Sequence, residues 1–335
     1  MSGRHRLVQL ADTHGTRLLC RVEEPLLRVV KGYASVYDLA RAALFAGRPL
    51  IEFLEAQLGA DTIPYDDVYE GRTGLRFLPA IDHPREPARC LVSGTGLTHR
   101  RSVDTRQSMH AADETITDSM RMYELGVAGG RPAAGCVGVA PEWFYKGNGF
   151  QLRGHGWPLE VPSYAEDGGE EPEIAGVYLV DDDGNPRRVG MAVGNEFADH
   201  KLEKRNYLYL AASKMRACAL GPELVLDPDF QEVRGAVAIE RDGREIWSRD
   251  IRGGENAMCH SLANIEHHHF KYDAHRQPGD VHVHFLGADA FSFGAGIELR
   301  DGDVMQVAYE GFGRPLRNAL AAAKGPETLV RALPV

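Results

Sequence analysis

The 335-residue chain lacks paired cysteines, long hydrophobic runs and a signal-like start. Its five cysteines stand apart from one another without Cys-x-x-Cys spacing: Cys20, Cys90, Cys136, Cys218 and Cys259. An odd number of scattered cysteines argues against a disulfide framework and a zinc knuckle, and it favours a reducing compartment. No apolar run approaches the roughly 18 residues that a membrane span requires. We therefore expect a soluble cytoplasmic protein without membrane contact.

A strongly basic segment is also absent. The formal net charge is −10, and no run of Lys or Arg is longer than two. Proteins that bind nucleic acids or anionic membranes usually carry a basic patch, so we expect no nucleic-acid partner. The hydrophobic content of 43% is sufficient for an ordinary globular core.

Residues 1–87 are predicted to form a small N-terminal α+β domain. Residues 7–10 and 16–22 have the apolar pattern of strands, whereas residues 36–45 and 50–58 carry apolar side chains at helical spacing. A proline-containing linker ends this segment.

Residues 88–335 are predicted to form a larger domain. From residue 135 onward, short runs typical of strands alternate with turns that contain Gly or Pro. The whole chain is therefore predicted to be an α+β protein with a β-rich mixed sheet. Residues 99–130 are polar and helical in pattern, with few large apolar side chains before Met120. A segment so poor in core residues is predicted to be a mobile lid over a site.

Three glutamates form the strongest candidate site in the sequence. Glu171 and Glu173 stand at the start of a predicted strand over residues 174–180, and alternate side chains of a strand share one face. After a turn, a returning strand over residues 189–194 ends beside Glu196. Converging carboxylates repel each other unless a cation compensates them, and oxygen ligands suit Mg²⁺, Mn²⁺ or Ca²⁺. The alternative is three solvated acids in an acidic chain.

A histidine-rich region offers a rival metal site. His282 and His284 share one face of a predicted strand, and Glu255 or Glu266 could complete a Zn²⁺ or Fe²⁺ site with them. Residues 267–269 are three successive histidines with a helical pattern, so their side chains point about 100° apart and cannot share one metal. We expect these histidines on a helix surface or at a subunit contact.

Further motifs flank the three glutamates in a fixed order. They are a Pro-x-x-Phe-x-Lys pattern at residues 141–147, a lysine at residue 214 and a Leu-Gly-Pro turn at residues 220–222. A Gly-Asp strand at residues 299–304 and a Gly-rich Leu-x-Asn segment at residues 311–318 follow. Over residues 90–320 the chain thereby resembles the fumarylacetoacetate hydrolase superfamily, and it looks closest to the branch that degrades sugar acids. The resemblance implies a catalytic domain at residues 88–335 and a divalent metal bound by Glu171, Glu173 and Glu196. It also implies a homodimer and a small 2-oxo sugar acid as substrate.

The resemblance makes His99 a candidate general acid or base. Hydrolases of the superfamily carry a Gly-x-Asn-Tyr-x-x-His-x-x-Glu pattern whose His–Glu dyad activates water. Here Gly96 and Leu97 stand where Asn and Tyr are expected, and no acid lies three residues beyond His99. The nearest acids are Asp104 and, deeper in the predicted lid, Glu114, which we assign as the partner of His99. This departure argues against a simple hydrolase.

The substrate-binding positions also depart from the superfamily pattern. Ala288 stands where a threonine often contacts the substrate carboxylate, and Ser292 is the nearest substitute. His200 and Glu203 replace an arginine and a glutamine, which indicates a polyhydroxylated substrate because both can hydrogen-bond sugar hydroxyls. Lys146 is predicted to contact the substrate as a second lysine near the metal.

The resemblance implies chemistry that starts from the enolate of a 2-oxo acid stabilised by the metal. The reaction expected is dehydration of a 2-keto-3-deoxy-pentonate, with Lys214 as the base at C3 or the enolate stabiliser and His99 assisting the departing hydroxyl. One alternative is a hydrolase that cleaves C3–C4 of a 2,4-diketo acid and releases pyruvate. The other is a sugar-acid-binding protein that has lost its activity.

Overall fold

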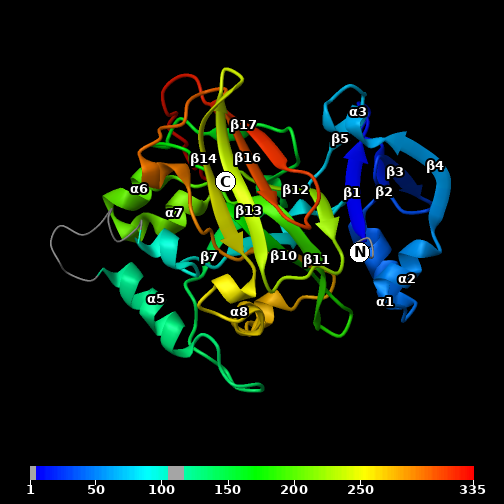
Figure 1. The fold of residues 1–335 in the computed structure, drawn as a ribbon, viewed down its shortest axis with the longest axis horizontal. Helices are drawn as coiled ribbons and strands as arrows, with labels where there is room; N and C mark the ends of the chain where they lie inside the picture. Colours follow the sequence, from blue (N-terminus) through cyan, green and yellow to red (C-terminus); the bar gives the residue numbers. More distant parts are fainter. Residues whose placement is uncertain (1–4, 105–116) are drawn as a thin grey trace.

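Two β-sheets form the framework of the protein. The computed structural model describes residues 5–104 and 117–335, which contain a 12-stranded sheet and a 5-stranded sheet (Figure 1). Helices lie around both sheets, so the predicted α+β class with a β-rich mixed sheet is confirmed. Among the described residues, no helix is long and apolar enough to cross a membrane.

The N-terminal elements follow the predicted pattern closely. Ser35 caps the first helix by accepting a hydrogen bond from the Asp38 backbone N–H at 3.0 Å, and the buried side chains of that helix recur at helical spacing. The second helix is shorter than predicted, because Leu58 already pairs with Val30 in a sheet. The bounds are β1 Arg6–Ala11, β2 Arg17–Glu23, β3 Leu26–Val30, α1 Val36–Phe45, α2 Leu50–Glu55, β4 Leu58–Pro64, α3 Tyr65–Tyr69 and β5 Arg76–Phe77.

The large sheet joins these N-terminal strands to the rest of the chain. Ten of its strands follow the order β4-β3-β2-β1-β12-β11-β10-β15-β6-β7, while β5 pairs with β1 and β8 pairs with β12 beside this path. Strand β1 pairs antiparallel with β12. The predicted domain division at residue 87 stays a prediction. The remaining strands of this sheet are β6 Cys90–Gly94, β7 Phe144–Asn148, β8 Leu152–Arg153, β10 Pro172–Val180, β11 Pro186–Asn195, β12 Cys218–Val225 and β15 Val281–Phe285.

The smaller sheet packs against the central strands of the larger one. Ile174 and Val193 of the large sheet share a buried cluster with Val237 and Val307 of the small sheet. Every residue of β10 is consequently buried. The small sheet contains β9 Leu159–Val161, β13 Val233–Arg241, β14 Arg244–Gly253, β16 Val304–Tyr309 and β17 Leu316–Ala322.

The α-helices whose full bounds lie within the described part of residues 88–335 are α5 Asp118–Gly129, α6 His200–Arg205, α7 Leu210–Lys214 and α8 Leu262–Phe270. Helix α5 belongs to the predicted lid, whose residues 105–116, with Glu114 among them, lie outside the described residues. The movement of this lid stays a prediction.

Candidate metal centre

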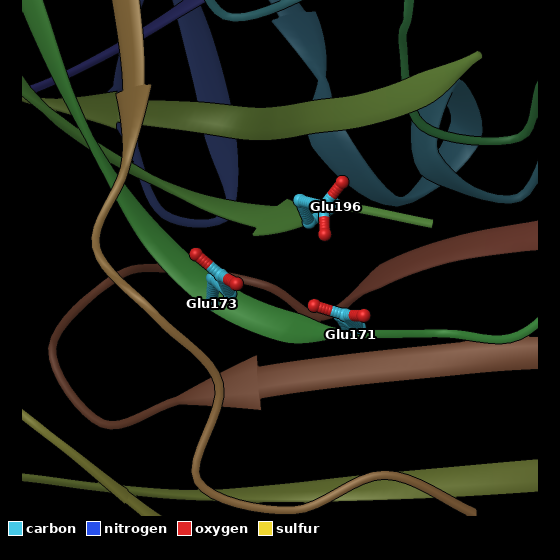
Figure 2. Close-up of side chains that lie close together, drawn as sticks. All are labelled: Glu171, Glu173 and Glu196. Atoms are coloured by element: carbon cyan, nitrogen blue, oxygen red, sulfur yellow. The ribbon is translucent and has the colours of Figure 1, made fainter. Parts of the chain in front are cut away.

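The β10–β11 hairpin brings the three predicted glutamates together. Pro172 pairs with Asn195, and the Glu196 backbone N–H donates to the Glu171 carbonyl at 2.9 Å. Residues that face each other across an antiparallel pair share a face, as do residues i and i+2 of one strand. Glu171, Glu173 and Glu196 therefore point toward one another, as Figure 2 shows. One oxygen of each carboxylate lies within 4.8 Å of the others, so the group could hold one metal ion.

Burial makes this carboxylate cluster electrostatically unfavourable by itself. All three glutamates are buried. Burial raises the pKa of Glu173 well above its ordinary value, and repulsion from Glu196 and Glu171 adds to that shift. Burial also raises the pKa of Glu196 to about 7, against the lowering effect of Lys146 and Lys214. A buried set of hard oxygen ligands with repelling charges fits a divalent cation such as Mg²⁺.

Two lysines predicted from the sequence lie at the same cluster. The Lys146 ammonium, on β7, donates to Glu196 and to the Phe197 carbonyl, the latter at 2.9 Å. Lys214, at the end of α7, donates to Glu171 Oε1 at 2.7 Å and also to Glu196. Both side chains are fully buried. Their charges compensate part of the negative charge of the three carboxylates.

Helix α6 brings His200 to the metal cluster. His200 Nε2 lies 3.0 Å from Glu171 Oε1. Burial lowers the pKa of His200, but the hydrogen bond to Glu171 and the negative charge of Glu171 raise it by more. The net shift of the pKa is therefore upward. Glu203 lies in the same helix and is also buried. The predicted contacts of His200 and Glu203 with a substrate stay predictions.

Ser292 has a partner within the protein. Its backbone N–H and its hydroxyl donate to the two oxygens of Glu170, at 2.5 and 2.8 Å. Both residues are buried. The predicted contact of Ser292 with a substrate carboxylate stays a prediction.

His99 is buried rather than exposed on a polar helix. The Thr98 hydroxyl donates to the Leu286 carbonyl at 3.0 Å, so it must accept the 2.9 Å hydrogen bond from His99 Nδ1–H. Nε2 then carries a lone pair, and it has no hydrogen-bond partner among the described residues. Burial lowers the pKa of His99 to about 4, so the ring is neutral near pH 7. Its proposed partner Glu114 lies outside the described residues.

The structure adds Glu142, which the sequence reasoning missed. Glu142, Phe144 and Lys146 are buried while the residues between them are exposed, so the three side chains share one face of this extended segment. The Tyr207 hydroxyl donates to Glu142, whose Oε1 occupies the space where a side chain at Gly96 would begin. The alternation around the Phe-x-Lys motif was a signal that could have identified Glu142.

The histidine-rich region does not form the rival metal site. His282 Nδ1 lies 2.9 Å from His269 Nε2, and the two ring nitrogens of His284 bond to the hydroxyls of Ser93 and Thr95. Glu266 accepts a hydrogen bond from Tyr178 instead. Within residues 5–104 and 117–335, the three glutamates form the one group of three or more potential ligands close enough to hold a metal.

A short stretch of the sequence matches a characterised enzyme. No protein-family model matches the chain. A local alignment gives 33% identity over 118 residues with 2-dehydro-3-deoxy-D-arabinonate dehydratase of Saccharolobus solfataricus. The match spans 34% of this chain and 38% of the length of that relative.

Solved structures match almost the whole chain. A structure of 2-keto-3-deoxyarabinonate dehydratase superposes with a TM-score of 0.71 at 18% identity, covering 96% of this chain and 100% of that one. A structure of 2-keto-3-deoxy-D-arabinonate dehydratase complexed with magnesium and 2,5-dioxopentanoate gives a TM-score of 0.70 at 19% identity and the same coverage. A 5-carboxymethyl-2-hydroxymuconate delta-isomerase from Mycobacterium smegmatis gives 0.57 at 16% identity, again over 96% and 100% of the two chains. These likenesses show that the chain shares the fold of these solved structures, in agreement with the fold expected from its resemblance to the fumarylacetoacetate hydrolase superfamily.

Proposed function

We propose that the chain is a metal-dependent hydro-lyase that removes water from a 2-keto-3-deoxy sugar acid of the pentonate type. The observation that carries the proposal is the buried glutamate cluster flanked by Lys146 and Lys214. The local match to a sugar-acid dehydratase, and a structural neighbour that contains magnesium and 2,5-dioxopentanoate, support this choice of reaction.

The residues around the cluster suit a 2-oxo acid. Glu171, Glu173 and Glu196 would hold the ion, which supplies Lewis-acid polarisation of the carboxylate and 2-oxo oxygens when bound. Lys214 already donates to two of these carboxylates. Its ammonium is therefore placed to donate a hydrogen bond where negative charge develops on a substrate oxygen, rather than to act as the base at C3.

Glu142 is the residue that we assign to proton transfer. Dehydration removes a proton from C3 and breaks the C4–O bond, and the departing hydroxyl takes up a proton to leave as water. The resulting 5-hydroxy alkene, with its double bond between C3 and C4, then isomerises to 2,5-dioxopentanoate by loss of a proton from C5, protonation at C3 and tautomerisation of the enol so formed. Glu142 accepts the C3 proton, with its carboxylate oriented by the Tyr207 hydroxyl. The resulting carboxylic acid can return the proton to the hydroxyl that leaves C4, so no nucleophilic water is required.

The surroundings of His99 favour dehydration over hydrolysis. A water-activating histidine is normally oriented by a carboxylate, whereas His99 Nδ1 bonds to the Thr98 hydroxyl. The unprotonated Nε2 can accept a hydrogen bond from a substrate hydroxyl.

Product analysis tests the proposal. NMR of a 2-keto-3-deoxy-pentonate incubated with the enzyme and Mg²⁺ should show 2,5-dioxopentanoate with all five carbons retained. Turnover should disappear when the metal is chelated. Release of pyruvate from a 2,4-diketo acid, with no turnover of 2-keto-3-deoxy-pentonates, would establish the hydrolase instead. Binding of sugar acids without turnover of either class would indicate an inactive binder.

A further inference from the structure

The imidazole of His200 lies in a closed aromatic slot. The Phe291 ring stacks on it with centroids 4.8 Å apart and an interplanar angle of 14°. Phe293 covers it at 5.1 Å and 37°. The ring also approaches Gly169 so closely that a Cβ there would collide with it. These contacts bury His200 and leave little of its surface for a substrate.

Ser292, which lies between the two phenylalanines, connects this aromatic slot to the residues that precede β10. Ser292 donates two hydrogen bonds to Glu170, which is fully buried and directly precedes Glu171. We call Phe291, Ser292 and Phe293 the 291–293 clamp. The clamp therefore holds the imidazole of His200 and the start of β10 in one fixed relation.

One ring nitrogen of His200 reaches the metal cluster. Because an ionised carboxylate only accepts hydrogen bonds, His200 Nε2 carries the hydrogen in its 3.0 Å contact with Glu171 Oε1. Lys214 donates to the same oxygen at 2.7 Å. Two buried donors on one oxygen restrict rotation of the Glu171 carboxylate.

We propose that His200, fixed by the 291–293 clamp, is a positioning residue that orients Glu171 to bind a divalent cation. The role differs from the substrate contact predicted from the sequence. It rests on the metal centre of the proposed function, and not on the reaction that follows. Residues that orient a metal ligand commonly change metal affinity by about 10- to 100-fold when they are removed.

Binding of Mn²⁺ to the full chain, measured by isothermal titration, tests the proposal. His200→Phe keeps an aromatic ring in the slot but removes the donor, and we expect the Kd for Mn²⁺ to rise about tenfold. His200→Gln retains an N–H donor and should recover most of that loss. Phe291→Leu and Ser292→Ala loosen the clamp and should each raise the Kd by a smaller factor.

His155→Phe is the matched control. His155 is also buried, stacks on Tyr69 at 4.3 Å and accepts a hydrogen bond from the Arg317 backbone, but it touches none of the three glutamates. Its replacement should change the melting temperature without changing the Kd for Mn²⁺.

The proposal would be overturned if His200→Phe had the wild-type Kd for Mn²⁺. It would also be overturned if His200→Phe and His200→Gln lost the same amount of Mn²⁺ affinity. If His200→Phe does not fold, the two clamp variants test the proposal instead. An unchanged Kd for Mn²⁺ in both Phe291→Leu and Ser292→Ala would then overturn the proposal. The readout is metal binding, so failure of this proposal leaves the reaction untouched. Conversely, absence of dehydratase activity leaves the proposed role of His200 in metal binding untouched.

Discussion

At the scale of single residues, Glu142 carries the step that most distinguishes the proposed reaction. Glu142→Gln keeps the shape of the side chain and removes the base, so kcat should fall by at least about 100-fold. The Kd for Mn²⁺ should stay unchanged, because Glu142 is not one of the clustered ligands. Steady-state kinetics and Mn²⁺ titration measure the two effects. The exposed Glu232→Gln serves as control, and a Glu142→Gln enzyme with wild-type kcat would remove Glu142 from the mechanism.

Residue-scale prediction from the sequence worked where geometry is local. The clustering of Glu171 and Glu173 with Glu196 follows from the period of a strand and one hairpin, and it is confirmed. The burial of His99 was not predictable, because its hydrogen-bond partner Thr98 is bonded to the Leu286 carbonyl, nearly two hundred residues away. The alternation around the Phe-x-Lys motif could have indicated Glu142, but its contacts with Gly96 and Tyr207 come from distant segments and could not be predicted.

At the scale of elements, strand β15 places two histidines in the interior. Burial lowers the pKa of His282 to about 3, with the charge of His275 as a smaller cause. As the pH falls below about 6.5, His282 is therefore protonated in the unfolded chain before it is protonated in the folded protein. The free energy of unfolding that His282 contributes at neutral pH is lost between about pH 6.5 and pH 3. At pH 5 this histidine should cost about 2 kcal/mol of unfolding free energy.

Thermal melts of His282→Gln between pH 7 and pH 5 measure this effect. The variant should lose less stability on acidification than the wild type, whereas the exposed His14→Gln should follow the wild type. Parallel pH curves for His282→Gln and the wild type would show that His282 does not titrate on unfolding.

The positions of the elements were predicted better than their ends. Helix α1 and the β10–β11 hairpin match their apolar periodicity. Helix α2 ends early because Leu58 is taken into the sheet by β3, a tertiary pairing that outweighs the helical spacing of the sequence.

At the scale of the whole molecule, Glu223 ties the N-terminal strands to the rest of the chain. Its buried carboxylate accepts hydrogen bonds from Arg6 at 2.7 Å, from the Tyr65 hydroxyl at 2.8 Å and from the Arg314 backbone at 2.9 Å. Glu223→Gln removes the charge while nearly keeping the shape, so it should lower the free energy of unfolding by about 2 kcal/mol. Urea melts measure that loss. The exposed Asp273→Asn should change stability by less than about 0.5 kcal/mol, and an equal effect of both variants would contradict a joining role for Glu223.

The order of the strands in the large sheet could not be derived from the sequence. Strand β1 lies beside β12 although more than two hundred residues separate them, and only side-chain packing over that distance selects the pairing. The resemblance to a known superfamily indicated the fold, whereas strand patterns alone indicated only its class.

The central claim is that Glu171, Glu173 and Glu196 hold one divalent cation. Titration of the wild type and of Glu173→Gln with Mn²⁺ is the most direct test, because the substitution removes one ligand charge and keeps the volume. We predict one tightly bound ion per wild-type chain, and loss of that binding in the variant together with loss of turnover. Equal Mn²⁺ binding by both proteins, or no binding by the wild type, would contradict the metal centre.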